Sequence, residues 1–202
     1  MRSPRVIASA ALGIAGATAL VIASAGSASA DTGATGGTTV ISVPATTVAA
    51  AARAGIVAAP TKPATVKFNK TTKAFDTSFP VTGGDADVPT FTGTLEHGGK
   101  IVIANCKKRK FATISQLNLD LVTNVISGVV TGSKDPVALF DLAGDGSFSV
   151  NGPTQSYSAT ELDVDPAGAA ALDAALKTTF FNGGQNIGSF TTTFTQTVTD
   201  AG

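Results

Sequence analysis

The chain has 202 residues, with 14 basic and 14 acidic side chains, one histidine, one tyrosine, one cysteine and no tryptophan. Nucleic-acid-binding proteins carry a marked basic excess, so this charge balance predicts no nucleic-acid partner. One cysteine cannot form an internal disulfide, and one histidine excludes a zinc site built from several histidines.

The first 30 residues form a predicted signal peptide. Arg2 and Arg5 provide a basic start, an apolar stretch follows, and Ala28-Ser29-Ala30 matches the small-residue cleavage pattern. An uncleaved membrane anchor is the alternative, but the apolar stretch is short for a membrane span. No second apolar run follows it. We therefore expect a mature chain without a transmembrane segment, secreted or held in the cell envelope.

The mature chain is expected to form one domain. Residues 31–37 are rich in glycine and threonine and are predicted to be a flexible leader. Residues 38–202 are long enough to bury a hydrophobic core of their own. The sequence thus divides into a signal peptide (1–30), a leader (31–37) and a single domain (38–202).

The N-terminal half predicts a strand, a helix and then short strands. Residues 38–43 are rich in β-branched side chains and predict a strand. An Ala-rich helix is expected over residues 44–54, ended by Gly55, and residues 56–65 are expected to form a turn region or an irregular edge. Gly98-Gly99 is a signal for a two-residue hairpin. Further strands are predicted at residues 65–69, 74–79, 90–97 and 100–105.

The C-terminal half continues this pattern and ends in strand, helix and strand. Asp165 and Pro166 predict a helix start, and Leu172, Leu176 and Phe180 form one apolar stripe. The final strand places Phe190, Phe194 and Val198 on one face, and Gly144-Asp145-Gly146 is interpreted as a hairpin turn. The predicted strands span residues 113–121, 125–131, 137–142, 147–150, 157–164 and 187–198.

Short strands about ten residues apart favour an antiparallel arrangement over parallel βαβ units. The predicted fold is mainly β, an antiparallel β-sandwich with two short Ala-rich helices at its edges or ends.

Two single residues are the candidate ligand-binding groups. His97 lies in Glu96-His97-Gly98-Gly99. It is expected to be solvent-exposed at a hairpin tip, with ligand contact as the alternative. Tyr157 is interpreted as a strand aromatic half in the core, or as a phenol ligand. Without a nucleophile elbow or a metal-binding cluster, the sequence predicts no enzyme and no catalytic residue.

Other charged groups have simpler interpretations. Glu161, Asp163 and Asp165 alternate as a carboxylate row on a strand that leads into a helix cap. The basic run Lys107–Lys110 is interpreted as a solvated loop or a protected strand edge, or else as an anchor for anionic polymer or lipid headgroups. Cys106 beside it is either a reactive thiol or a half-buried free one.

Several segments, taken in order, resemble the HtaA-like domains, a family of secreted actinobacterial haem-uptake modules. The resemblance covers most of residues 38–198. The segments are Phe79-Pro-Val-Thr-Gly-Gly84, Gly93-Thr-Leu-Glu-His-Gly-Gly99, Val137-Ala-Leu-Phe-Asp-Leu142, and Asp165 to Leu176 with the Phe…Gly…Ile-Gly tail.

The resemblance implies a β-sandwich with short helices. It also implies that members which bind haem ligate the iron through a tyrosine supported by a histidine. His97 matches the histidine, whereas the tyrosine expected near the start of the domain has no counterpart, because Tyr157 is the only tyrosine. We therefore expect a divergent, non-enzymatic HtaA-like domain without a cofactor, in a structural or surface-interaction role with an envelope component or partner protein. Haem or other small-ligand binding in iron uptake is the alternative.

The cleavage motif makes the first testable prediction. N-terminal sequencing of exported protein should begin at Asp31, directly after Ala28-Ser29-Ala30. A sequence that began at Met1, or more than a few residues from Asp31, would contradict it.

Overall fold

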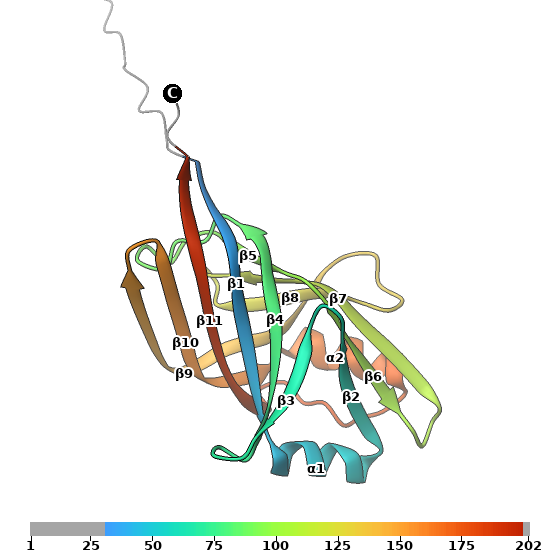
Figure 1. The fold of residues 1–202 in the computed structure, drawn as a ribbon. Coiled ribbons are helices and arrows are strands. Elements are labelled where there is room, and N and C mark those ends of the chain that lie inside the picture. Colours follow the sequence, from blue (N-terminus) through green and yellow to red (C-terminus); the bar gives the residue numbers. More distant parts are fainter. Residues whose placement is uncertain (1–30, 200–202) are drawn as a thin grey trace, which may run out of the picture.

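The computed structural model describes residues 31–199, and side chains over residues 33–197, so the predicted signal peptide lies outside the described part (Figure 1). The described chain forms strands β1 (Asp31–Pro44), β2 (Ile56–Thr61), β3 (Thr65–Asn69), β4 (Ala74–Gly84), β5 (Thr94–His97), β6 (Lys100–Asn105), β7 (Lys110–Asp120), β8 (Val125–Val130), β9 (Val137–Asn151), β10 (Thr154–Val164) and β11 (Asn186–Thr199). Its helices are α1 (Ala45–Ala54) and α2 (Pro166–Leu176).

Eight of the eleven described strands form a closed antiparallel barrel, and β2, β3 and β6 extend the sheet outside the ring. β1 pairs with β11 on one side and with β4 on the other, and β4, β5, β7, β8, β9, β10 and β11 complete the ring. The predicted sandwich is therefore wrong, although the mainly β class and the antiparallel pairing are confirmed. Alternating apolar and polar residues bury one face of a sheet in a sandwich and in a barrel alike, so this pattern does not distinguish the two architectures. Long strands with bulges, as between Thr35 and Gly37, can coil until the sheet closes.

Strands also cover three segments whose sequence predicts irregular structure. Residues 31–37, predicted as a flexible leader, form the first half of β1 along β11. Residues 56–61 form edge strand β2, paired with β6. Gly144-Asp145-Gly146 is not a hairpin turn but lies within β9, where Gly144 and Asp145 form a bulge opposite Thr160 of β10. Partner strands supply backbone hydrogen bonds that outweigh the local turn preference of the glycines in the first and third segments and of Pro60 in the second.

The predicted hairpin at Gly98-Gly99 is also wrong. β5 and β6 do not pair with each other; both pair with β7, one after the other, as two parts of one long strand. Gly99 has a φ of 99°, and a Cβ there would lie 2.7 Å from the Cβ of Ala64. The two glycines therefore bend a strand where other chain packs closely, and they do not reverse its direction.

Helix α2 begins as predicted and packs onto the barrel, but it ends at Leu176, so Phe180, which was predicted to extend its apolar stripe, lies beyond the helix and is only half-buried. The Asp165 side chain accepts hydrogen bonds from the N–H groups of Ala167 (2.6 Å) and Gly168, and Pro166 occupies the first turn. Gly168 allows close approach to the sheet, because a Cβ there would lie 2.7 Å from Cα of Leu139. Leu172 and Leu176 are buried. Asn105 Nδ2 donates to the Leu176 carbonyl at 3.1 Å, which secures the C-terminal end.

Helix α1 is attached more loosely. Gly55 ends it in the left-handed conformation, with φ of 91°, as the sequence predicts. None of its residues is fully buried, and the helix lies across one end of the barrel, at the bottom of Figure 1. Over the described residues, no helix is long and apolar enough to span a membrane.

The barrel interior holds the core. Phe190 and Phe194 point inward from β11, as predicted, each 1% exposed; the side chain of Val198 lies outside the described part. Thr192 lies between them on the same inner face. The other large, fully buried side chains are Phe79, Leu95, Ile114, Leu119, Leu121, Leu139, Leu162, Leu172, Leu176 and Val88.

We predict that Leu172→Asp strongly destabilises the domain, because Leu172 is 1% exposed and its replacement buries an unpaired carboxylate. The cost is about 3–5 kcal/mol, which lowers the melting temperature by roughly 10 °C in a domain of this size. Thermal unfolding followed by circular dichroism measures the change. Ala170→Asp, on the exposed face of the same helix, is the control and should melt close to wild type. Equal melting of the two variants would mean that α2 does not dock through Leu172.

Candidate ligand-binding site

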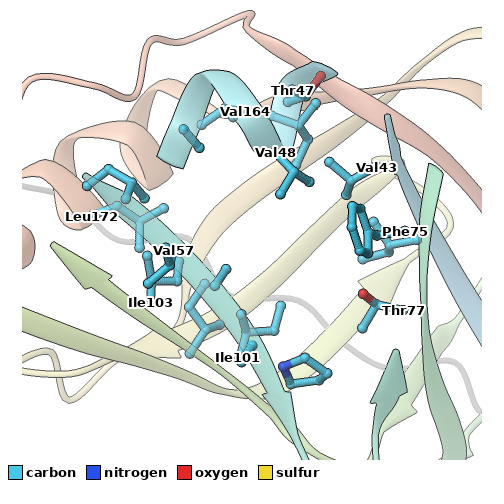
Figure 2. A pocket seen from close by; sticks show the side chains of 18 of the residues that line it. Val43, Thr47, Val48, Val57, Phe75, Thr77, Ile101, Ile103, Val164 and Leu172 are labelled. Carbon is cyan, nitrogen blue, oxygen red and sulfur yellow. The ribbon is translucent and has the colours of Figure 1, made fainter. Parts of the chain in front are cut away.

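An apolar cavity of about 420 Å³ lies beneath α1, at the end of the barrel that this helix crosses. Its walls come from α1, β1, β2, β3, β4, β6, β7, β9, β10, α2, β11 and the segment before β11. Figure 2 shows Val48, Val57, Ile101, Ile103 and Phe75 around it. Among the lining residues, only Thr47, Thr77 and Gln185 are polar, and none is ionisable. The volume and the apolar lining are those of a small-molecule site.

The cavity exists because the long β5–β6 strand changes partner. Up to His97 its outer neighbour is β4, and from Lys100 onward its neighbour is β2. The Gly98 N–H donates to the Pro80 carbonyl at 2.9 Å, which marks the last contact with β4. Beyond that point β2 and β4 are not paired; β3, which pairs with β4, stands between them, and α1 lies across the lower end of these strands in Figure 1.

Three apolar side chains at the cavity remain in contact with solvent. Val48 of α1 is 37% exposed, Val57 of β2 is 46% exposed and Val66 of β3 is 47% exposed, and all three line the cavity. Apolar side chains that are both cavity wall and surface indicate an opening toward solvent. Such a patch is a common feature of ligand and interaction sites.

His97 lies inside the barrel, so the prediction of a solvent-exposed tip is wrong. It is 8% exposed because Gly98 and Gly99 continue its strand, and its cross-strand neighbours Val81 and Leu117 are buried with it. Its Nε2 is 2.6 Å from Oγ1 of Thr39, which in turn contacts Oγ1 of Thr192 at 2.8 Å.

Burial removes water from the imidazole and lowers the pKa of His97 to about 4, although hydrogen bonding to the backbone of Leu117 and Leu95 acts in the opposite direction. The ring is therefore neutral at physiological pH. It forms part of a buried polar chain across β5, β1 and β11, and it is not among the residues that line the cavity.

Tyr157 shares this interior layer without contacting His97 through a hydrogen bond. It stands opposite Thr192 in the β10–β11 register. Its hydroxyl donates to Oδ1 of Asn124 at 3.1 Å, and burial raises its pKa. Its ring meets that of Phe91 edge-on, with 5.5 Å between the ring centroids. The fold thus places both predicted ligand residues in the barrel interior, separated by Thr39 and Thr192, and neither lines the cavity.

The remaining candidates do not form a site. Glu161 and Asp163 alternate with buried Leu162 and Val164 on β10: Glu161 is exposed, Asp163 pairs in register with Asp141, and Asp165 caps α2. Burial, and then the charges of Asp165 and Asp163, raise the pKa of Asp141. Across the described residues, no cluster of His, Cys, Asp and Glu side chains could hold a metal ion.

The basic run occupies the turn between β6 and β7. Cys106 in this turn is exposed, which answers the question of a half-buried thiol. Lys107 reaches across to α1, where its Nζ donates to the Arg53 carbonyl at 2.9 Å. The run therefore adjoins the C-terminal end of the helix that covers the cavity.

One comparison with a known structure supports this fold. The structure is similar to the C-terminal domain of HtaA from Corynebacterium glutamicum, with a TM-score of 0.61 and 15% sequence identity over 82% of this chain and 99% of that domain. A weaker similarity, with a TM-score of 0.48 and 14% identity over 82% of this chain and 96% of the other, is to the heme binding protein HtaB of the same organism. No family model and no curated protein matches the sequence.

The chain is therefore a closed antiparallel barrel with a helix-covered cavity at one end. More particularly, it has the fold of the HtaA C-terminal domain, which confirms at the level of fold the resemblance inferred from the sequence.

The buried His97 makes stability depend on pH. Its folded pKa of about 4 is below the unfolded value of 6.5, so the unfolded chain takes up a proton first as the pH falls. The contribution of His97 to the free energy of unfolding is fully present above pH 6.5. It declines between pH 6.5 and pH 4 and changes no further below pH 4. Between pH 7 and pH 4.5 wild type should lose about 2 kcal/mol more than His97→Gln in urea unfolding. Equal losses would show that His97 titrates alike in both states.

Proposed function

We propose that this chain is an exported, non-enzymatic binding protein that holds an elongated apolar molecule, such as an acyl chain, in the cavity beneath α1. The observation that carries the proposal is the lining: apolar side chains surround a volume of about 420 Å³, and no charged group faces it. A charged ligand buried there would lack a partner, whereas a hydrocarbon needs none.

The energetics favour a chain-like ligand. Each methylene transferred from water into an apolar site contributes about 0.8 kcal/mol, so about ten buried methylenes contribute roughly 8 kcal/mol before the cost of immobilising the ligand. Thr47, Thr77 and Gln185 are the polar side chains available to orient it. Catalysis is not part of the proposal, because the lining supplies no nucleophile with an adjacent base.

Haem is the second candidate, because the fold is that of the HtaA C-terminal domain and the cavity walls are apolar. The residues present do not fit axial ligation of iron. The lining contains no histidine, tyrosine, cysteine, methionine or lysine, and Nε2 of His97 contacts Thr39 within the barrel. Any haem in this cavity would be held by contacts with its porphyrin faces alone.

We predict that Ala51→Phe weakens binding of the neutral fluorescent probe N-phenyl-1-naphthylamine at least tenfold. Ala51 lines the cavity from α1, so a phenyl ring there occupies ligand volume. The measurement is a fluorescence titration of wild type and variant. Ala49→Phe is the matched control, because Ala49 is exposed on the same helix and does not line the cavity. Absence of probe binding to wild type, or equal loss in both variants, would refute an apolar site beneath α1.

A haemin titration separates the two candidates. We expect no sharp Soret band of ligated haem, and displacement of the probe by long-chain fatty acids. A ligated Soret band that disappears in His97→Ala or Tyr157→Phe would instead establish haem as the ligand and require the barrel interior to open.

A further inference from the structure

The end of the barrel that carries α1 is rich in basic side chains. Arg53 lies in the last turn of α1, Lys70 and Lys73 lie in the β3–β4 turn, and the Lys107–Lys110 run forms the β6–β7 turn. All of them are exposed. We name this set the basic rim. Asp76 is the acidic neighbour on β4, and its carboxylate already accepts hydrogen bonds from Ser42 and Asn69.

Exposed apolar side chains lie among these cations. Phe111 directly follows the basic run and is 71% exposed, and Phe68 of β3 is 49% exposed. The register places Phe111, Ala104 and Val57 side by side across β7, β6 and β2, on one face of the sheet. Phe68 packs against Phe75, which lines the cavity, with 5.1 Å between the ring centroids. The apolar surface therefore continues from the outer face into the cavity.

We propose that this end of the barrel docks on an anionic lipid bilayer and that the cavity takes an acyl chain of an anionic lipid. The inference rests on the proposed function and names its ligand class. A soluble polyanion would contact only the basic side chains. A bilayer also has an apolar interior in which Phe111, Phe68 and Val57 can be buried. The cations complement the anionic headgroup of a lipid, and the exposed apolar side chains and the apolar cavity complement its acyl chains.

The charges determine the strength and the salt dependence of docking. Each basic side chain near an anionic membrane raises partitioning about fivefold, so three of them account for about 100-fold. Screening shortens this attraction at high salt, so binding must weaken as ionic strength rises. The apolar side chains add a contribution that salt does not remove.

The experiment is co-sedimentation of the chain from Asp31 onward, which contains every strand of the closed barrel, with phosphatidylcholine vesicles that do or do not contain phosphatidylglycerol. Binding should require phosphatidylglycerol and weaken with salt. Replacing Lys70, Lys108 and Lys110 together by glutamine should lower partitioning about 100-fold. Replacing Lys62, Lys100 and Lys134 by glutamine removes the same charge outside the basic rim and should have a much smaller effect.

A single fluorescent reporter tests the depth of docking. Because the chain has no tryptophan, Phe111→Trp places the only indole beside the basic rim. Its emission should shift to shorter wavelength on anionic vesicles, and Phe111→Ser should weaken binding without changing the melting temperature. Docking on anionic lipid would be overturned by equal binding to both kinds of vesicle or by equal effects of the two triple variants. It would also be overturned if polyglutamate competed for binding and Phe111→Ser had no effect. Binding of N-phenyl-1-naphthylamine in solution would still support an apolar ligand site in the cavity. Failure of membrane docking can therefore be distinguished from failure of the proposed ligand binding.

Discussion

The change of partner at Gly98-Gly99 determines how this barrel is built. The β5–β6 strand must stay paired with β7 along its whole length, yet its other edge passes from β4 to β2. An unbroken strand would keep β4 as neighbour and close the barrel end with side chains. Two glycines let the backbone pass Ala64 and Pro80 closely enough to divide the sheet. The apolar cavity and its covering helix both depend on that division.

The barrel interior beyond the cavity contains a buried polar chain, in which Thr39 is the register partner of the cavity residue Phe79. His97, Thr39 and Thr192 link three neighbouring strands through side-chain contacts of 2.6 and 2.8 Å. Buried polar groups that satisfy one another are costly to separate, so a shift of one strand relative to its neighbours would leave them unpaired. These three polar side chains help to fix the register of β5, β1 and β11. This structural role of His97 differs from the ligand contact considered from the sequence.

Sequence patterns were sufficient where a signal is local. The helix cap at Asp165, the helix end at Gly55, the inward faces of β11 and most strand positions were predicted because each depends on a few neighbouring residues. His97 illustrates the limit. Alternation places His97 on the same face as Leu95, which is buried, whereas the two glycines after it suggested an exposed turn. Only the pairing of both β5 and β6 with β7 shows that His97 is buried. Barrel closure depends likewise on contacts between distant strands.

The cavity could not be located from the sequence because its wall is assembled from residues throughout the domain. The informative signal was the apolar run of residues 56–60, which lines the cavity yet was interpreted as irregular because of its proline. Helix α1 has a further consequence. Since it buries no residue fully, it can detach locally at much lower free energy than unfolding of the closed barrel. Ligand exchange can therefore be fast in a protein whose strands open only rarely, and amide hydrogen exchange would distinguish the two regions.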